Sequence, residues 1–233
     1  MRRQVTHPDI SGIGPLGGRN MSMENEKDLG TSLIKTVGKS DLAQLIPDFL
    51  EIGLDSQLTE GVLKELPIIS TSLAIYKATL GIRDFILLKK IILFLKEAGK
   101  VDEQERIEFF LKITEDKKYQ RRVGEQLLLY IDRLDDIEKA VILAKLFNGY
   151  VKREIEYDTF QKLSNAVDKT FIGDLRNMKQ YYSNDFKKVG KDILHHLAQS
   201  GLVSMESYMI LDTDGIIFKQ NKLGEIFIRL VLS

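Results

Sequence analysis

The densest run of apolar residues lies at positions 66–100, and the elements predicted for the rest of the chain are arranged around it. Pro67 suits the first turn of a helix, where its missing N–H is not needed. Over residues 82–98 the predicted second helix is apolar on nearly every side, and Gly99 fits the residue that ends a helix. The pattern therefore predicts a hydrophobic helical hairpin over residues 66–99.

Small residues recur every four positions along the first helix of this hairpin. Ser70, Ala74 and Ala78 share one helix face, and Gly81 follows three residues later. Because a row of small side chains lets a neighbouring helix approach closely, we expect this face to be a helix–helix contact.

The apolar hairpin fits two environments, a protein core or a lipid surface. Its longest uncharged run is the eleven residues 66–76, whereas a membrane span needs about 20, so a spanning helix is not expected. Residues 62–100 carry seven Lys or Arg and three Asp or Glu, a balance typical of segments that meet anionic lipid from one side. The side chains for either role are Ile82, Phe85, Ile86, Ile91, Leu93 and Phe94.

Two charged residues, Arg83 and Asp84, stand inside this apolar helix. Charges in apolar surroundings are costly unless they are paired. We therefore expect buried ion pairs with charged residues of neighbouring helices. Such pairs would be either structural or a polar anchor of a hairpin that can leave the core.

Successive amphipathic helices are predicted for the remainder of residues 31–170. Asp-x-x-Glu or Asp-x-x-Gln capping boxes begin at Asp102, Asp135 and Asp158, and apolar residues at helical spacing mark a helix over 119–134. Residues 40–53 and 58–66 are helical in pattern as well. Residues 31–170 are thus predicted to be a helical bundle. Residues 1–30, with the Gly- and Pro-rich run SGIGPLGGRN, are predicted to be a disordered segment or a remnant foreign to the native protein.

The pattern changes over residues 171–233. A helix is predicted over 184–200, two strands over 207–211 and 216–220, and a last helix over 222–232. The strands flank Asp212-Thr213-Asp214-Gly215, which is a hairpin turn signal. The expected fold class is therefore mainly α, with a small C-terminal unit that contains a β-hairpin.

The order of these C-terminal elements resembles a winged helix. The runs LAQSGLV (197–203) and KLGEIF (222–227) carry the resemblance, which covers about residues 171–232. It implies that the helix before the hairpin contacts a partner or nucleic acid, through Lys187, Lys188, Lys191 and His195. Asp212 and Asp214 depart from the basic wing of DNA-binding members. Because DNA binding depends on phosphate neutralisation, we favour protein contact or a structural role.

A second resemblance covers residues 41–232. The runs KELPIISTSLAIYKA and IRDFILLKKIILFLKE are similar to an uncharacterised family of bacterial helical proteins. The family has no assigned activity, so the resemblance implies bacterial origin and fold alone.

The amino-acid composition excludes several kinds of functional site. The chain has no Cys, which excludes disulfides and cysteine nucleophiles and fits a cytoplasmic location. His195 and His196 are adjacent and point about 100° apart on a helix, so they do not converge on a metal. The acidic pairs at 102–103 and 135–136 stand at predicted helix starts, where carboxylates cap backbone N–H groups. We predict no catalytic residue, cofactor or metal.

Three functions follow from these patterns. The first is a non-enzymatic cytoplasmic interaction or regulatory protein of bacterial type. It would bind a protein partner through the winged-helix-like unit or the basic apolar hairpin. The second is a membrane-acting effector or stress or defence protein that releases its hairpin onto lipid, and the third is a winged-helix DNA-binding regulator. A homo-oligomer is compatible with each of them.

Overall fold

The computed structural model describes residues 23–46, 65–76, 81–183, 189–210 and 213–232. Helices dominate, and the mainly α fold class is confirmed. In chain order the elements are α1 (Met23–Val37), α2 (Leu42–Leu45), α4 (Pro67–Tyr76), α5 (Ile82–Ala98), α6 (Glu103–Glu115), α7 (Lys117–Arg133), α8 (Glu138–Val151), α9 (Tyr157–Lys169), α10 (Ile172–Tyr182), α11 (Lys191–Gln199), β1 (Ser204–Ile210), β2 (Thr213–Lys219), α12 (Lys222–Phe227) and the π-helical η3 (Ile228–Leu232).

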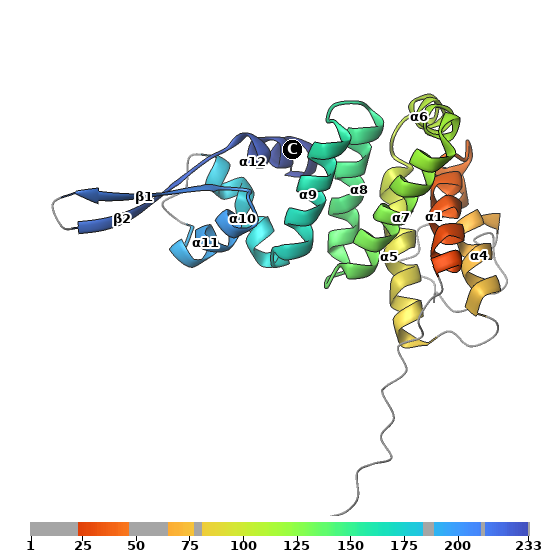
Figure 1. Ribbon diagram of the computed structural model, residues 1–233, viewed down its shortest axis with the longest axis horizontal. Helices are drawn as coiled ribbons and strands as arrows, with labels where there is room; N and C mark the ends of the chain where they lie inside the picture. The colour runs from red at the N-terminus through yellow and green to blue at the C-terminus, as the bar shows by residue number, and fades with distance from the viewer. Residues whose placement is uncertain (1–22, 47–64, 77–80, 184–188, 211–212, 233) are drawn as a thin grey trace, which may run out of the picture.

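The helices lie side by side in a row that narrows toward the C-terminal elements (Figure 1). α1 packs between α4 and α7, α5 packs on α8, and α8 packs on α9. At the far end of the row the strands β1 and β2 project away from the helices (Figure 1). One cluster of buried apolar side chains runs from Leu29 on α1 to Val231 on η3, so the bundle and the C-terminal elements share a core.

The first helix was not predicted. Helix α1 begins at Met23, so the predicted disorder is wrong for residues 23–30, while residues 1–22 lie outside the described part. Leu29, Leu33 and Ile34 are at most 1% exposed. They share one face of the helix and bury it against α4 and α7.

Two glycines allow α1 and α7 to cross closely. A Cβ added to Gly124 would lie 2.3 Å from the carbonyl oxygen of Gly30, and one added to Gly30 would lie 2.6 Å from the backbone nitrogen of Glu125. Neither position can accept a larger side chain unless the helices move apart.

The predicted hairpin contains two helices, but they are not a packed pair. α4 lies against α1, where Thr71 Oγ1 and Ser32 Oγ are 2.9 Å apart and the Ile68 N–H donates to Thr36 Oγ1 at 3.0 Å. The row of small residues was also assigned wrongly, because Ser70 and Ala74 are exposed. Ala78 lies outside the described residues.

Helix α5 changes character along its length. Ile91 and Phe94 are buried in the core and Leu93 is half-buried, whereas Ile82 is 84% and Ile86 is 44% exposed, with Phe85 between these extremes. No helix in the described ranges combines the length and the apolarity that crossing a bilayer requires.

The expectation of buried charges at Arg83 and Asp84 is wrong. The Arg83 side chain is 85% exposed and lies 3.9 Å from Asp132 Oδ2, and Asp84 Oδ2 accepts the Gly81 N–H at 3.0 Å. The buried cation of α5 is Lys90, which donates to the carbonyl oxygens of Asp132, at 3.0 Å, and Leu134. Burial lowers the pKa of the Lys90 ammonium group.

Of the three predicted capping boxes, at Asp102, Asp135 and Asp158, the structure confirms the helix start at Asp102 alone. Asp102 Oδ1 accepts the backbone N–H of Gln104 at 2.8 Å, as a helix cap should. At α8 the N–H of Glu138 is accepted by Asp136 at 2.7 Å instead of by Asp135. Helix α9 begins at Tyr157, one residue before the predicted Asp158 cap. Of the predicted helices over 40–53 and 58–66, the structure describes α2, and residues 47–64 lie outside it.

Candidate functional site: the C-terminal ribbon

The strands β1 and β2 form an antiparallel two-stranded ribbon, here called the ribbon. Its register pairs Ser204 with Lys219 and Ile210 with Thr213. The predicted strand limits are therefore shifted, because Thr213, Asp214 and Gly215 belong to β2 and not to the turn. Asp212 lies outside the described residues.

The base of the ribbon is held by polar contacts around α12. Asn221 Oδ1 accepts the Gly224 N–H at 2.9 Å, and Asn221 Nδ2 donates to the carbonyl oxygen of Gly201 at 3.0 Å. The Tyr182 hydroxyl donates to the Leu202 carbonyl oxygen at 2.7 Å. Gly201 has a φ of +82°, a conformation that favours glycine, and it turns the chain from α11 toward β1.

The C-terminal helices fix this unit to the bundle. Lys145 Nζ on α8 donates to the Val231 carbonyl oxygen at 2.7 Å, and Phe227 is fully buried. Gly149 on α8 faces the Leu230 side chain, since an added Cβ would lie 2.8 Å from it. The ribbon therefore projects from a firmly packed base.

The predicted contact residues of the α11 region are placed only in part. Helix α11 begins at Lys191 after Gly190, seven residues later than predicted, and Lys187 and Lys188 lie outside the described residues. Lys191 is exposed. His195 is half-buried, with its ring 4.9 Å from that of Phe218 on β2, so it serves to pack the ribbon against α11.

Charges of the C-terminal region are balanced. Residues 171–233 contain eight Lys or Arg and seven Asp or Glu. Glu206 on β1 pairs with Lys219 on β2, and His196 Nδ1 lies 2.9 Å from Asp174 Oδ2. These opposite charges neutralise one another locally, which disfavours binding to phosphates.

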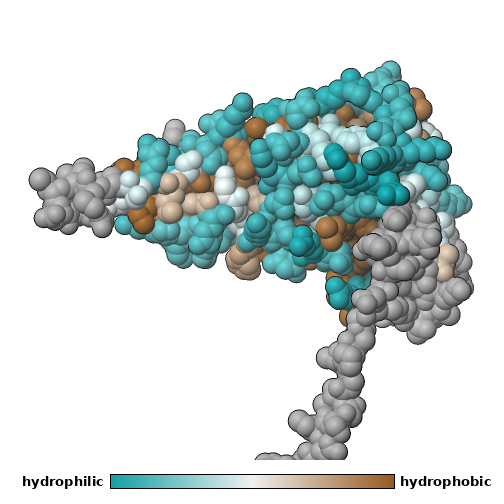
Figure 2. Space-filling view, in the orientation of Figure 1, coloured by the Kyte–Doolittle hydropathy of each residue, from teal (hydrophilic) through white to brown (hydrophobic). Residues whose placement is uncertain are grey.

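Exposed apolar side chains distinguish the ribbon. Met205 is 52%, Ile216 48% and Ile217 45% exposed. Because side chains alternate along a strand, Met205 and Ile216 lie on the ribbon face that carries Phe218, and Ile217 lies on the opposite face. Figure 2 shows hydrophobic surface, in brown, on the coloured part of this projection.

Sequence reasoning missed Met205, because it placed the first strand at 207–211. The signal available was short, since it consists of apolar Met205 between polar Ser204 and Glu206. Within the described residues, no group of three or more His, Asp or Glu side chains could hold a metal ion.

Comparison of the chain with protein-family models, curated proteins and solved structures finds no match.

Proposed function

We propose that this is a non-catalytic interaction protein that binds a protein partner through the ribbon. The exposure of Met205, Ile216 and Ile217 on a projecting element carries the proposal. An isolated two-stranded ribbon is marginally stable in water, and clustered exposed apolar side chains mark surfaces that contact other molecules. A partner that covers both ribbon faces would remove this apolar surface from water.

The order α10, α11, β1, β2, α12 supports a winged-helix-like arrangement in which the wing contacts protein. The near-neutral charge of residues 171–233 favours protein over DNA, because little phosphate charge would be neutralised. Within this proposal the protein acts in a bacterial cytoplasm, since the resemblance to bacterial helical proteins implies the origin and the absence of Cys fits the compartment.

The geometry favours an extended segment as the bound part of the partner. In the described residues β1 and β2 pair only with each other, so each strand has an outer edge to which a further strand can hydrogen-bond. Alternating apolar side chains on a strand added beside β2 would lie next to Ile216 on one face and Ile217 on the other.

Selection from a library of displayed peptides tests this proposal. Peptides are selected on the purified chain and then measured on the double variant Ile216→Ser/Ile217→Ser. The control is Leu129→Ser, because Leu129 is a similarly exposed apolar residue, 42% exposed, on α7. We expect peptides with alternating apolar residues that bind the ribbon variant at least about tenfold more weakly and the control unchanged, since two anchors are lost.

The proposal would be overturned if the selected peptides bound the unmodified chain, the ribbon variant and the control equally well, or if no peptide were selected. Sedimentation of the chain alone gives a separate outcome. Concentration-dependent association that Ile216→Ser/Ile217→Ser abolishes would show that the ribbon pairs with a second copy instead of another protein.

A second candidate function is peripheral contact with an anionic membrane. At the start of α5, Ile82 and Ile86 are exposed beside the exposed cations Arg83 and Lys89. Apolar side chains next to cations favour attachment to anionic lipid surfaces. This contact needs no release of α5, whose other apolar side chains are buried in the core or packed against it.

Flotation with vesicles of phosphatidylglycerol and phosphatidylcholine tests the second candidate. We expect Ile82→Asp/Ile86→Asp to abolish flotation without lowering the melting temperature, because both side chains are exposed. The control is Leu111→Asp, at a residue 58% exposed on α6. Absence of the wild-type chain from the floated fraction at low salt would reject this function.

A further inference from the structure

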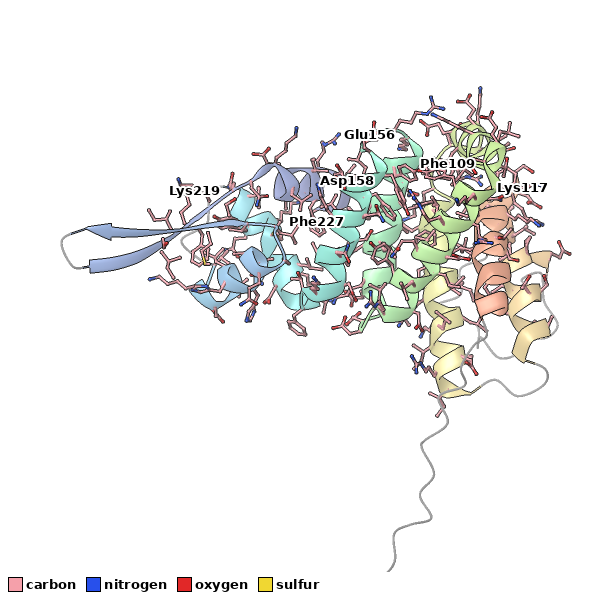
Figure 3. All side chains as sticks on the ribbon, in the orientation of Figure 1. Phe109, Lys117, Glu156, Asp158, Lys219 and Phe227 are labelled. Atoms are coloured by element: carbon pink, nitrogen blue, oxygen red, sulfur yellow. The ribbon has the colours of Figure 1, made fainter. Side chains whose placement is uncertain are left out.

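Helices α6, α7, α8 and α9, with the connection between α8 and α9, line a half-open pocket of about 450 Å³ that contains no residue of the ribbon. It lies at the end of the bundle where Figure 3 labels Phe109 and Glu156. Its buried and half-buried wall contains no ionised side chain and consists of Phe109, Ile113, Tyr119, Tyr150, Ile155 and Tyr157. Charged, exposed residues complete the lining, namely Lys112, Glu115, Asp116, Arg153 and Glu156.

The aromatic side chains of the wall are fixed by one another. The rings of Phe109 and Tyr150 meet edge to face with centroids 5.3 Å apart, and those of Tyr119 and Tyr157 do so at 5.8 Å. The Arg122 guanidinium lies over the Tyr119 and Tyr157 rings, at 5.7 Å and 6.0 Å. A wall held in this way is preorganised for a flat apolar molecule.

The three tyrosine hydroxyls have hydrogen-bonding capacity that the protein does not use. Tyr119 and Tyr150 share one hydrogen bond of 2.7 Å, so one of their two O–H protons is left over. The Tyr157 hydroxyl is buried and has no hydrogen-bond partner. Burial raises the pKa of Tyr157 to about 12 and that of Tyr150 further, so both remain neutral O–H donors.

The end of helix α8 shapes one side of this pocket. Among the described residues, Arg153 is the only one other than glycine with a positive φ, at 59°. It belongs to the connection between α8 and α9 and lines the pocket. This conformation ends helix α8 in a Schellman motif, in which the Glu154 N–H donates to the Gly149 carbonyl oxygen at 2.9 Å and the Arg153 N–H to that of Tyr150 at 3.0 Å.

We infer that this pocket binds a planar, uncharged aromatic compound that carries a hydrogen-bond acceptor. The aromatic wall selects a flat apolar body, and the absence of an ionised group from the wall selects a neutral one. The unused O–H donors select the acceptor: one proton of the Tyr119–Tyr150 pair is left over, and the buried Tyr157 hydroxyl gains a partner when its ring turns toward the ligand.

Binding of coumarin and indene tests the inference. Both are flat bicyclic compounds of similar size, but coumarin alone has a carbonyl acceptor. The full chain is labelled with ¹³C on its tyrosine rings, eight in total. We expect saturable shifts of Tyr119, Tyr150 and Tyr157, unchanged signals from Tyr181 and Tyr182, and about three- to tenfold tighter binding of coumarin.

The variant Tyr157→Phe removes one hydroxyl and keeps the ring. We expect it to abolish the preference for coumarin over indene, while the control Tyr181→Phe retains it. No saturable shift at the three pocket tyrosines would overturn the site, and an unchanged preference in Tyr157→Phe would overturn the assignment of the acceptor to that hydroxyl. We expect substitutions in the ribbon to leave both binding results unchanged. A failure of this inference would therefore leave the proposed function intact, and a failure of the proposed function would leave this inference intact.

Discussion

At the scale of single residues, Gly124 sets the distance between α1 and α7. Replacing Gly124 with Ala places a Cβ 2.3 Å from a backbone oxygen, which cannot turn aside as a side chain can. We expect the free energy of unfolding in urea to fall by about 2 kcal/mol, since overpacking outweighs the gain of about 1 kcal/mol in helix propensity.

Gly173 on α10 provides the matched control. The three atoms nearest to a Cβ there belong to the ring of Phe171, the first of them 2.7 Å away, and Phe171 is 66% exposed. Because an exposed ring can rotate, Gly173→Ala should leave stability unchanged or raise it by up to about 1 kcal/mol. Equal effects of the two substitutions would contradict the close crossing of α1 and α7.

Tyr157 is a second residue for which the direction of the change in stability on substitution can be predicted. Its buried hydroxyl lacks a partner, and such a group costs about 1–3 kcal/mol. We therefore expect Tyr157→Phe to raise the free energy of unfolding by about 1 kcal/mol in the absence of any ligand. A loss of stability in urea denaturation would show that the hydroxyl has a partner in solution.

At the scale of elements, Arg106 ties the start of α6 to the end of α1. Its guanidinium donates to the carbonyl oxygens of Val37 at 3.0 Å, Lys39 at 2.6 Å and Val101 at 3.2 Å. A cation at the end of a helix satisfies carbonyls that lack partners within the helix. The side chain is 2% exposed, so water cannot replace it.

We expect Arg106→Lys to lower the free energy of unfolding by about 2 kcal/mol, although the charge is kept. A lysine ammonium group lacks the planar fork that reaches several carbonyls at once. Arg121→Lys is the control, since Arg121 is exposed and forms a 3.4 Å pair with Glu125, and its effect should stay below about 0.5 kcal/mol. Thermal and urea denaturation of both variants measure the difference.

The elements also show what the sequence could predict. Helix α7 was located to within two residues, because Val123, Leu127 and Ile131 recur at helical spacing and are buried. Helix α1 was missed although Leu29 and Leu33 show the same spacing, because neighbouring Gly- and Pro-rich sequence dominated the interpretation. A helical pattern of apolar residues was thus sufficient to locate a helix only where no Gly- or Pro-rich sequence lay next to it.

The sequence pattern did not predict which helices contact one another when they are far apart in the sequence. Ser70 and Ala74 have a spacing suited to helix contact, yet α4 buries Ile68 and Ser72 instead. Periodicity identifies a face but not the helix that covers it. The aromatic pocket shows the same limit, since Phe109 and Tyr157 come from different helices that tertiary packing alone brings together.

At the scale of the whole molecule, the buried tyrosines make stability depend on alkaline pH. The pKa is raised by burial for Tyr130, Tyr150, Tyr157, Tyr181 and Tyr182. Above pH 10 the unfolded chain releases these protons while the folded chain keeps them, so the unfolded state binds fewer protons and stability falls as pH rises.

We expect the free energy of unfolding to fall from pH 10 upward, by about 1.4 kcal/mol per pH unit for each tyrosine that ionises only after unfolding. Lys90 acts in the opposite direction at lower pH, because its pKa is lowered by burial, and its contribution ends near its ordinary value of 10.5. Urea denaturation between pH 8 and pH 11 measures the slope. The variant Tyr150→Phe should reduce it, and a flat profile above pH 10 would contradict the burial of these hydroxyls.

The crossing of Gly30 and Gly124 has a consequence for how the chain is made. Ribosomes add about 5–20 residues per second, so α1 is synthesised about 5–20 s before the segment of α7 that covers it. Throughout that interval the apolar face of Leu29, Leu33 and Ile34 has no lasting partner from α7. The close crossing of α1 and α7 can therefore form only after translation has passed Gly124.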